Sequence, residues 1–203
     1  MAPARLRRLN RRLVEDLRED LAGLYVESRV PTPGDACRRP GRQGFLNRLA
    51  ADLARPGFAM VIAESDGLMG CAFGFPVRGD GSWWLGFDGV LPRGVGQLTV
   101  SGRAFAFGDI LIRPHPQDRE LARRVQERLL TDHQASLGAT LVDGDDRQTL
   151  SALRSWGWRD VGELRRPLGL TTFRALVFPL AARGTATPVG PVAMRGGGAP
   201  GGP

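Results

Sequence analysis

The most informative stretch of the sequence is Asp109–Leu130, which reads D-I-L-I-R-P-H-P-Q-D-R-E-L-A-R-R-V-Q-E-R-L-L. Its apolar beginning continues the run from Phe105 and predicts a buried strand over Phe105–Ile112 that is stopped by Pro114. From Asp118 to about His133 the pattern predicts a helix, with an apolar stripe of Leu121, Val125, Leu129 and Leu130. A short loop therefore leads from a buried strand directly into a helix N-terminus.

This junction is a candidate anion site. The first turn of a helix has backbone N–H groups without intrahelical partners, and the helix dipole adds positive potential there. Arg119, Arg123 and Arg124 place further positive charge beside it, so a diphosphate would suit this place. An ordinary strand–loop–helix unit with a solvated arginine face fits the same residues, and both interpretations stay open at this point.

The flanking segments predict a mixed α/β domain. Leucines spaced three and four residues apart over Leu13–Leu24 predict a helix with an acidic outer side. The further expected elements are a helix over Phe45–Leu53, strands over Phe58–Glu64 and Met69–Val77 joined by a turn, an irregular glycine-rich segment over 78–103, a strand over Ala139–Val142, a helix over Asp146–Trp156 capped by Gly157, and strands over Arg159–Leu164 and Thr172–Leu180. The order α-α-β-β-β-α-β-α-β-β predicts an α/β sandwich with a mixed sheet.

Length and composition indicate one domain with tails. The chain has 203 residues, of which 42% are hydrophobic, enough for a single core over residues 1–182. Residues 183–203 contain seven glycines and four prolines, which predicts a disordered tail. No apolar run approaches the length of a membrane helix, and no apolar segment follows the arginine-rich start as in a signal peptide. Cys37 and Cys71 form no metal-binding pair, so we expect incidental or buried thiols in a cytoplasmic protein without a metal.

The positive charge is confined to the ends of the chain. The net charge is +7, with 28 arginines and no lysine. Residues 14–182 carry 21 arginines and 21 acids, so the excess comes from a basic leader over residues 1–12 and from Arg183 and Arg195. The neutral body therefore argues against nucleic-acid binding, because such binding needs a net basic face. We expect the leader to be a solvated end, although a basic segment can also touch an anionic surface.

Residues within Asp109–Leu130 resemble the signature of the GNAT superfamily of acyl-CoA-dependent N-acyltransferases, V-x-P-x-x-Q/R-x-x-G-x-G/A. Ile112, Pro114, Gln117 and Ala122 match this motif in register. The resemblance extends over most of residues 6–180. It includes the two N-terminal helices, the G-F-P at residues 74–76, the G-D-D-R at residues 144–147 and the W-G-W at residues 156–158. It implies a GNAT-like, mostly antiparallel sheet flanked by helices and splayed between the fourth and fifth strands.

The resemblance also implies an acetyl-CoA site. Backbone groups of Ile110, Leu111 and Ile112 would pair with the pantetheine arm like an added strand. The pyrophosphate would be held at the helix start by backbone N–H groups, with Arg119 and Arg123 adding charge-assisted bonds. The residues expected there are Gln117, Asp118, Arg119, Glu120, Leu121, Ala122 and Arg123. A backbone N–H of the fourth strand would stabilise the oxyanion.

Two positions depart from the family pattern. Glu120 stands where glycine is preferred, so its side chain would crowd and repel the pyrophosphate unless it points outward. Leu153 stands where the family often has a tyrosine that protonates the leaving thiolate. Since a thiol has a pKa of about 8.5, the acid is dispensable. Tyr25 is the only tyrosine and a substitute candidate, with a packed aromatic as the alternative.

Direct acetyl transfer needs a base, because only a neutral amine attacks the thioester. Asp109 is the best candidate, since it interrupts an apolar strand just before the implied cofactor-binding stretch, where relatives often carry a glutamate. The alternative is a strand-end acid bonded to backbone. His115 and His133 are weaker candidates, as a loop residue and as a charge partner of the helix C-terminus. Trp83 and Trp84 would form an aromatic wall for the acceptor or cover the sheet edge.

The sequence leaves three functions open for this chain. The first is an N-acetyltransferase that moves an acetyl group from acetyl-CoA to an amine on a small molecule or peptide. The second is a non-catalytic acyl-CoA-binding protein of the same fold, which Glu120 and Leu153 favour. The third, a nucleic-acid-binding module using the basic leader, is opposed by the neutral body. The acceptor amine and a homodimeric state are left open.

Overall fold

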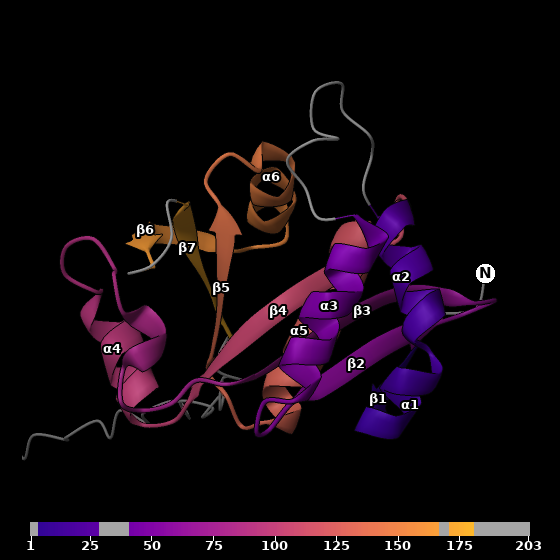
Figure 1. Cartoon of the computed structure of the whole chain (residues 1–203), viewed down its shortest axis with the longest axis horizontal. Helices are drawn as coiled ribbons and strands as arrows, with labels where there is room; N and C mark the ends of the chain where they lie inside the picture. Colours follow the sequence, from indigo (N-terminus) through magenta and orange to yellow (C-terminus); the bar gives the residue numbers. More distant parts are fainter. Residues whose placement is uncertain (1–3, 29–40, 167–170, 181–203) are drawn as a thin grey trace, which may run out of the picture.

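The computed structural model describes residues 4–28, 41–166 and 171–180. They form a seven-stranded sheet in the order β1-β2-β3-β4-β5-β7-β6. Neighbouring strands are antiparallel, except that β4 and β5 are parallel, so the predicted α/β fold with a mostly antiparallel mixed sheet is confirmed (Figure 1). The strands are β1 (Arg5–Leu9), β2 (Ala59–Glu64), β3 (Leu68–Pro76), β4 (Ala104–Ile112), β5 (Leu137–Asp143), β6 (Arg159–Arg165) and β7 (Thr172–Pro179).

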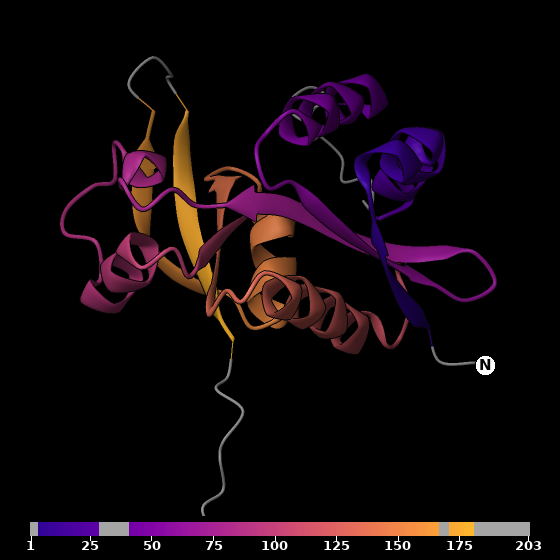
Figure 2. The same ribbon diagram turned by 90° about the horizontal axis from the view of Figure 1, so that it is seen from below.

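Helices cover both faces of the sheet (Figure 2). They are α1 (Arg11–Asp16), α2 (Arg18–Glu27), α3 (Arg42–Leu53), the 3-10 turn η1 (Ser82–Trp84), α4 (Arg93–Val100), α5 (Asp118–Asp132) and α6 (Arg147–Ser155). Because side chains alternate along a strand, Val61 of β2 lies in the core under α5 and α6, while Met60 lies in the opposite core with α1–α3. η1 and α4 pack on the same face as α1–α3, over β5 and β7.

The basic leader needs a correction, because its residues Arg5–Leu9 are the edge strand β1, paired antiparallel with β2. Leu9 is buried on the α1–α3 side, and Leu6 packs on the α5 side. Arg7 binds Glu64 through two hydrogen bonds of 2.9 and 3.1 Å. An edge strand needs few apolar residues and tolerates charge, which explains how an arginine-rich pentapeptide can form one.

The segment 78–103, predicted to be irregular, contains η1 and α4. Trp84 is buried and its Nε1 donates to the Thr99 hydroxyl at 3.0 Å, while that hydroxyl donates to the Val95 carbonyl at 2.9 Å. This chain of bonds joins η1 to α4 within the third core, and covering the sheet is therefore the role of Trp84.

Local signals explain several element boundaries. Asn10 caps α1, since its side chain accepts from the N–H of Leu13 at 2.9 Å, and Asp146 caps α6 through the N–H of Thr149 at 2.9 Å. The predicted cap Gly157 has a φ of 98°, a left-handed conformation that favours glycine. The helix expected over Leu13–Leu24 is two helices, with Leu17 between α1 and α2.

The W-G-W at residues 156–158 contacts α5 through Trp158. Trp158 is buried and donates through Nε1 to the Gln126 side chain, whose own Nε2 donates to the Ala122 carbonyl at 2.6 Å. Gln126 is fully buried, so this bond satisfies a polar group inside the core. The bond from Trp158 ties the middle of α5 to the residue just before β6.

The sheet opens between β4 and β5, as the resemblance implied. The two strands pair only through Ala104–Ala106 and Leu137–Ala139 within the described chain. Beyond that point they diverge (Figure 1), and the hydroxyl of Thr140 donates to the Phe107 carbonyl at 3.1 Å at the start of the opening. The opening exposes one edge of β4.

The predictions for Cys37 and for the tail over 183–203 lie outside the described residues. Across the described ranges, no helix is both long and apolar enough to cross a membrane.

Candidate active site

A β-bulge at Gly108 shapes β4 at the opening. Phe73 of β3 pairs with Asp109 and Gly74 pairs with Phe107, so Gly108 is an extra residue in β4. The bulge directs two successive residues toward the α3 side. A Cβ at position 108 would collide with Oδ2 of Asp52, and Asp109 binds Arg48 of α3 at 3.3 Å. Without the bulge, Asp109 would point into the core under α5.

Arg48 joins the two residues predicted to be catalytic. Its guanidinium bonds to Asp109 and lies 5.7 Å from the ring centre of Tyr25. Tyr25 is only 2% exposed and stacks on Phe45, with ring centres 4.6 Å apart. The structure therefore brings Asp109 and Tyr25 into one cluster around Arg48, with Tyr25 as a packed aromatic within it.

A second carboxyl, Asp52, was missed by the sequence analysis. It lies in the last turn of α3, is 18% exposed, and binds Nε of Arg55 through Oδ1 at 3.3 Å. Burial raises the pKa of the Asp52 carboxyl, and the negative charge of Asp109 adds to this, while Arg55 and Arg48 oppose it. We call Asp52 and Asp109 the acid pair.

The signal for Asp52 was present in the sequence. Phe45, Leu49 and Asp52 follow the spacing i, i+4, i+7, so the carboxyl continues the buried stripe of α3. A charged residue in such a stripe is costly to bury unless it has a partner or a function.

The implied pantetheine-binding residues lie along the open edge. The side chains of Leu111 and Ile112 are buried on opposite sides of the sheet, and Ile110 is partly buried against the α5 core. Only their backbone groups are therefore suited to pairing with a ligand that enters beside β4.

The start of α5 presents fewer free N–H groups than the sequence implied. The N–H of Gln117 donates to Nδ1 of His115 at 3.1 Å, and that of Asp118 donates to the His115 carbonyl at 2.9 Å. The N–H of Leu121 donates to the Gln117 carbonyl at 3.0 Å. Within the described chain this leaves Arg119 and Glu120 as the first-turn residues whose N–H groups have no backbone partner. His115, expected to be a solvated loop residue, braces this turn.

Glu120 is directed along the helix surface. It is 57% exposed and binds Arg123 through two hydrogen bonds of 2.9 and 3.1 Å, and Arg123 also binds Glu127 at 3.0 Å. The hydrogen bond from Arg123 lowers the pKa of the Glu120 carboxyl. Arg123 is therefore already occupied by two acids, whereas Arg119 is exposed and has no ion pair among the described residues. Leu121 and Ala122 have buried side chains and can contribute only backbone groups.

The other candidates have structural roles. Leu153 is buried in the core with α5. His133 packs on Phe105 with ring centres 4.9 Å apart. Burial lowers the pKa of His133, and the charge of Arg8 adds to this, which corrects its expected role as a charge partner of the helix. Cys71 is fully buried and burial raises the pKa of its thiol, as expected for an inert cysteine.

Trp83 packs against the same core as Trp84, and its contact with the acceptor stays a prediction. It is partly buried, and its carbonyl accepts from Arg166 at 3.1 Å. Burial and the neighbouring charge of Arg55 lower the pKa of Arg166.

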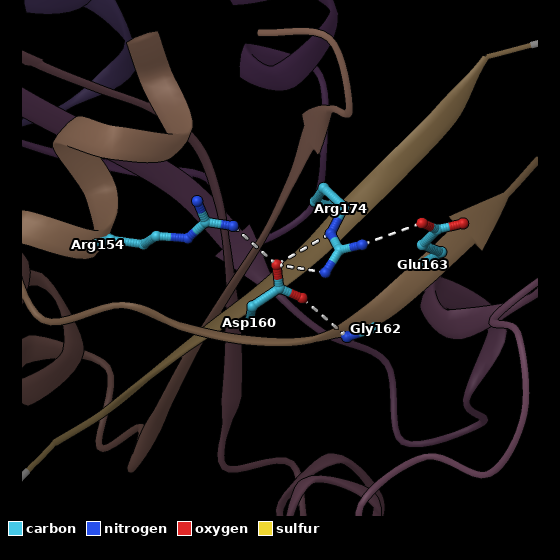
Figure 3. A network of polar contacts seen from close by, with 5 residues as sticks. All are labelled: Arg154, Asp160, Gly162, Glu163 and Arg174. Carbon is cyan, nitrogen blue, oxygen red and sulfur yellow. Dashed lines mark hydrogen bonds and ion pairs between the residues drawn. The ribbon is translucent and has the colours of Figure 1, made fainter. Parts of the chain in front are cut away.

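A separate polar network lies on α6, β6 and β7 (Figure 3). Asp160 binds both Arg174 at 2.7 Å and Arg154 at 3.2 Å, and Arg174 also binds Glu163 at 3.0 Å. A shallow depression of about 440 Å³ borders it, lined by Gly144, Arg147, Leu150, Arg154 and Arg174. Arg154 and Arg174 are already paired with Asp160. Because Arg154 belongs to α6 and Asp160 to β6, the network holds the β6–β7 hairpin against α6.

Comparison with known proteins identifies the fold. The chain matches no protein-family model and no curated protein sequence. It is similar in structure to a protein from Desulfovibrio desulfuricans described as an acetyltransferase of the GNAT family, with 15% identity, a TM-score of 0.52, and coverage of 88% of this chain and 99% of that one. An aminoglycoside 6'-acetyltransferase type Ii gives 12% identity and a TM-score of 0.52 over 89% of this chain and 99% of that one.

A chimera of the Vibrio cholerae spermidine N-acetyltransferase SpeG and hSSAT gives 11% identity and a TM-score of 0.51 over 88% of this chain and 96% of that one. At such identities the likeness establishes the fold, which is that of the GNAT acetyltransferases, as the sequence resemblance implied.

Proposed function

We propose that this chain is an N-acetyltransferase that transfers an acetyl group from acetyl-CoA to an amine by direct attack on the thioester. The observation that carries the proposal is the opening between β4 and β5. The acid pair lies at Gly108 and Asp109, where this open edge of β4 begins, and α5 starts shortly after Ile112, where β4 ends. The fold supports acetyl transfer, and the site supports the chemistry. Acetyl-CoA supplies the activated acetyl group.

The binding role belongs to β4 and α5. Backbone groups of Ile110, Leu111 and Ile112 would pair with the pantetheine arm along the open edge of β4. The N–H groups of Arg119 and Glu120, with the side chain of Arg119, would hold the pyrophosphate at the positive end of the helix. A backbone N–H at the bulge would stabilise charge on the thioester oxygen.

The proton-transfer role belongs to Asp109. The bulge directs it to the α3 face of β4, and Arg48 fixes its carboxyl. In this proposal Asp109 removes a proton from the acceptor ammonium, which leaves a neutral nucleophile beside the thioester. The leaving thiolate needs no strong acid, since its pKa is only about 8.5. Leu153, buried in the core, has no part in this step.

A second function, non-catalytic acyl-CoA binding, is favoured by one observation: Leu153 provides no proton donor at the position where the family often has one. The experiment that separates the two is calorimetry with acetyl-CoA, followed by an assay for release of CoA thiol over a panel of amines. We expect binding and amine-dependent thiol release. Binding without release selects the second function, and no binding excludes both.

A further inference from the structure

The acid pair contains a carboxyl that the proposed function does not use. Asp52 reaches β4 from α3, and its Oδ2 lies so close above Gly108 that a Cβ there would collide with it. Gly108 is the bulged residue, at the point where β4 has just separated from β5. Asp52 is therefore beside the same part of β4 as Asp109, although 57 residues separate the two in sequence.

The two oxygens of Asp52 differ. Oδ1 is bound by Nε of Arg55 at 3.3 Å. Oδ2, the oxygen toward β4, has no hydrogen-bond partner among the described residues, and the Asp52 side chain is 18% exposed to solvent. One oxygen thus anchors the carboxyl and the other can accept a proton.

The stoichiometry of acetyl transfer calls for two proton acceptors. An amine that arrives as an ammonium loses two protons from its nitrogen when it becomes an amide. One of these protons ends on the sulfur of CoA as the new N–C bond forms and the C–S bond breaks, and the other passes to solvent. Asp109 can hold only one of them at a time.

We propose that Asp52 is a second catalytic residue, which accepts through Oδ2 the proton that the acceptor nitrogen loses as the N–C bond forms and the C–S bond breaks. This proton then passes through solvent to the leaving thiolate, while the first proton, taken by Asp109, is released to solvent. This proposal rests on the proposed acetyl transfer and assigns a further group to it. The charges around Asp52 suit the role: Asp109 faces it from β4, while Arg48 and Arg55 belong to its own segment. Burial and Asp109 raise the pKa of Asp52 toward the working pH, where a general base is most effective.

The direct test is Asp52→Asn, which keeps the shape of the side chain and removes the proton acceptor. We expect turnover to fall by roughly 10²-fold, the lower end of general-base effects, with acetyl-CoA affinity nearly unchanged. Asp132→Asn is the matched control: Asp132 also lies in the last turn of a helix, binds an arginine close to it in sequence and is 17% exposed, but it lies on α5, across the sheet. We expect that variant to keep parental turnover.

The pH profile distinguishes catalysis from support of the fold. Activity of the parent should fall as the pH drops through the raised pKa of Asp52. Because the charge and the hydrogen bond of Arg55 lower this pKa, Arg55→Gln should move the acid limb of activity to higher pH while Asp109 is kept. This measurement probes Asp52 without replacing it, so it also serves if Asp52→Asn unfolds.

The outcomes separate the two proposals. An active parent with an equally active Asp52→Asn variant overturns the role of Asp52 alone, and so does an acid limb that Arg55→Gln leaves in place. A parent that binds acetyl-CoA and acetylates no amine overturns the proposed function and this role with it. Equal loss in Asp52→Asn and Asp132→Asn assigns the effect to general destabilisation and overturns the catalytic role.

Discussion

Removing the charge of Glu120 should tighten acetyl-CoA binding. Glu120 lies in the first turn of α5, beside the N–H groups that would hold the pyrophosphate, and glycine is the residue that the family prefers there. Its carboxylate is bound by Arg123, which also binds Glu127. Glu120→Gln would remove one negative charge beside the anion and free Arg123 from one of its two acids.

The size of the effect follows from the exposure of Glu120. Two unit charges at a separation several times the contact distance interact by ~1 kcal/mol at an effective dielectric near 20. Because Glu120 is 57% exposed, solvent screening reduces this to roughly 0.5–1 kcal/mol, which is about two- to fivefold in Kd. Glu120→Gly should give the same gain in affinity, with a cost in stability of ~1 kcal/mol for glycine in a helix.

Calorimetry with acetyl-CoA and thermal unfolding on the same variants separate affinity from stability. Glu127→Gln is the matched control, because it also releases Arg123 but lies two turns along the helix. We expect a smaller change in Kd for it, and a gain for Glu120→Gln that shrinks as salt is added. Unchanged or weaker binding in Glu120→Gln would refute pyrophosphate binding at the first turn of α5.

Three further predictions concern the opening and the opposite face. Asp109→Asn should lower turnover by roughly 10²-fold and leave the Kd of acetyl-CoA nearly unchanged; parental turnover at neutral pH would exclude Asp109 as the base. Gly108→Ala should lower turnover and cost about 1–3 kcal/mol of stability, because the new Cβ collides with Asp52 and the Phe73 ring, whereas Gly94→Ala, with open space at its Cβ, should fold as the parent does. The pKa of His133 is lowered in the folded state. Its contribution to stability is therefore complete above its unfolded pKa of about 6.5 and declines as the pH falls below that value. In urea unfolding at neutral and acid pH, His133→Gln should lose less stability on acidification than the parent, whereas an equal loss would show that His133 charges freely in the folded state.

The central elements could be predicted because their signals are local. The strand before Pro114 and the helix after Gln117 have strong periodic patterns, and both are confirmed as β4 and α5. The opening between β4 and β5 was implied by the motif and not by periodicity. It depends on where pairing between two distant strands stops, at Ala106 and Ala139.

The missed elements have weak local signals. β1 contains three arginines in five residues, and only pairing with β2 makes it a strand. α4 contains two glycines, and its attachment depends on Trp84 reaching Thr99 fifteen residues away. Tertiary contacts therefore make β1 a strand and α4 a helix, although the local sequence of each has a weak propensity for that structure.

Site residues divide in the same manner. Asp109 stood out as a charge in an apolar strand, but the bulge that turns it toward α3 depends on the pairing of β4 with β3. The occupation of Arg123 by Glu120 and Glu127 could have been read from their three- and four-residue spacing. Asp52 could have been suspected from its place in the stripe of α3, although its contact with Gly108 could not.

The most direct test of the account is to map acetyl-CoA onto the backbone by amide hydrogen exchange. The account predicts slower exchange on binding at Gly108–Ile112 of β4 and at Arg119 and Glu120 of α5, with little change at the β6–β7 hairpin. Protection confined to that hairpin and the arginine-lined depression beside α6, or no protection at β4, would contradict it.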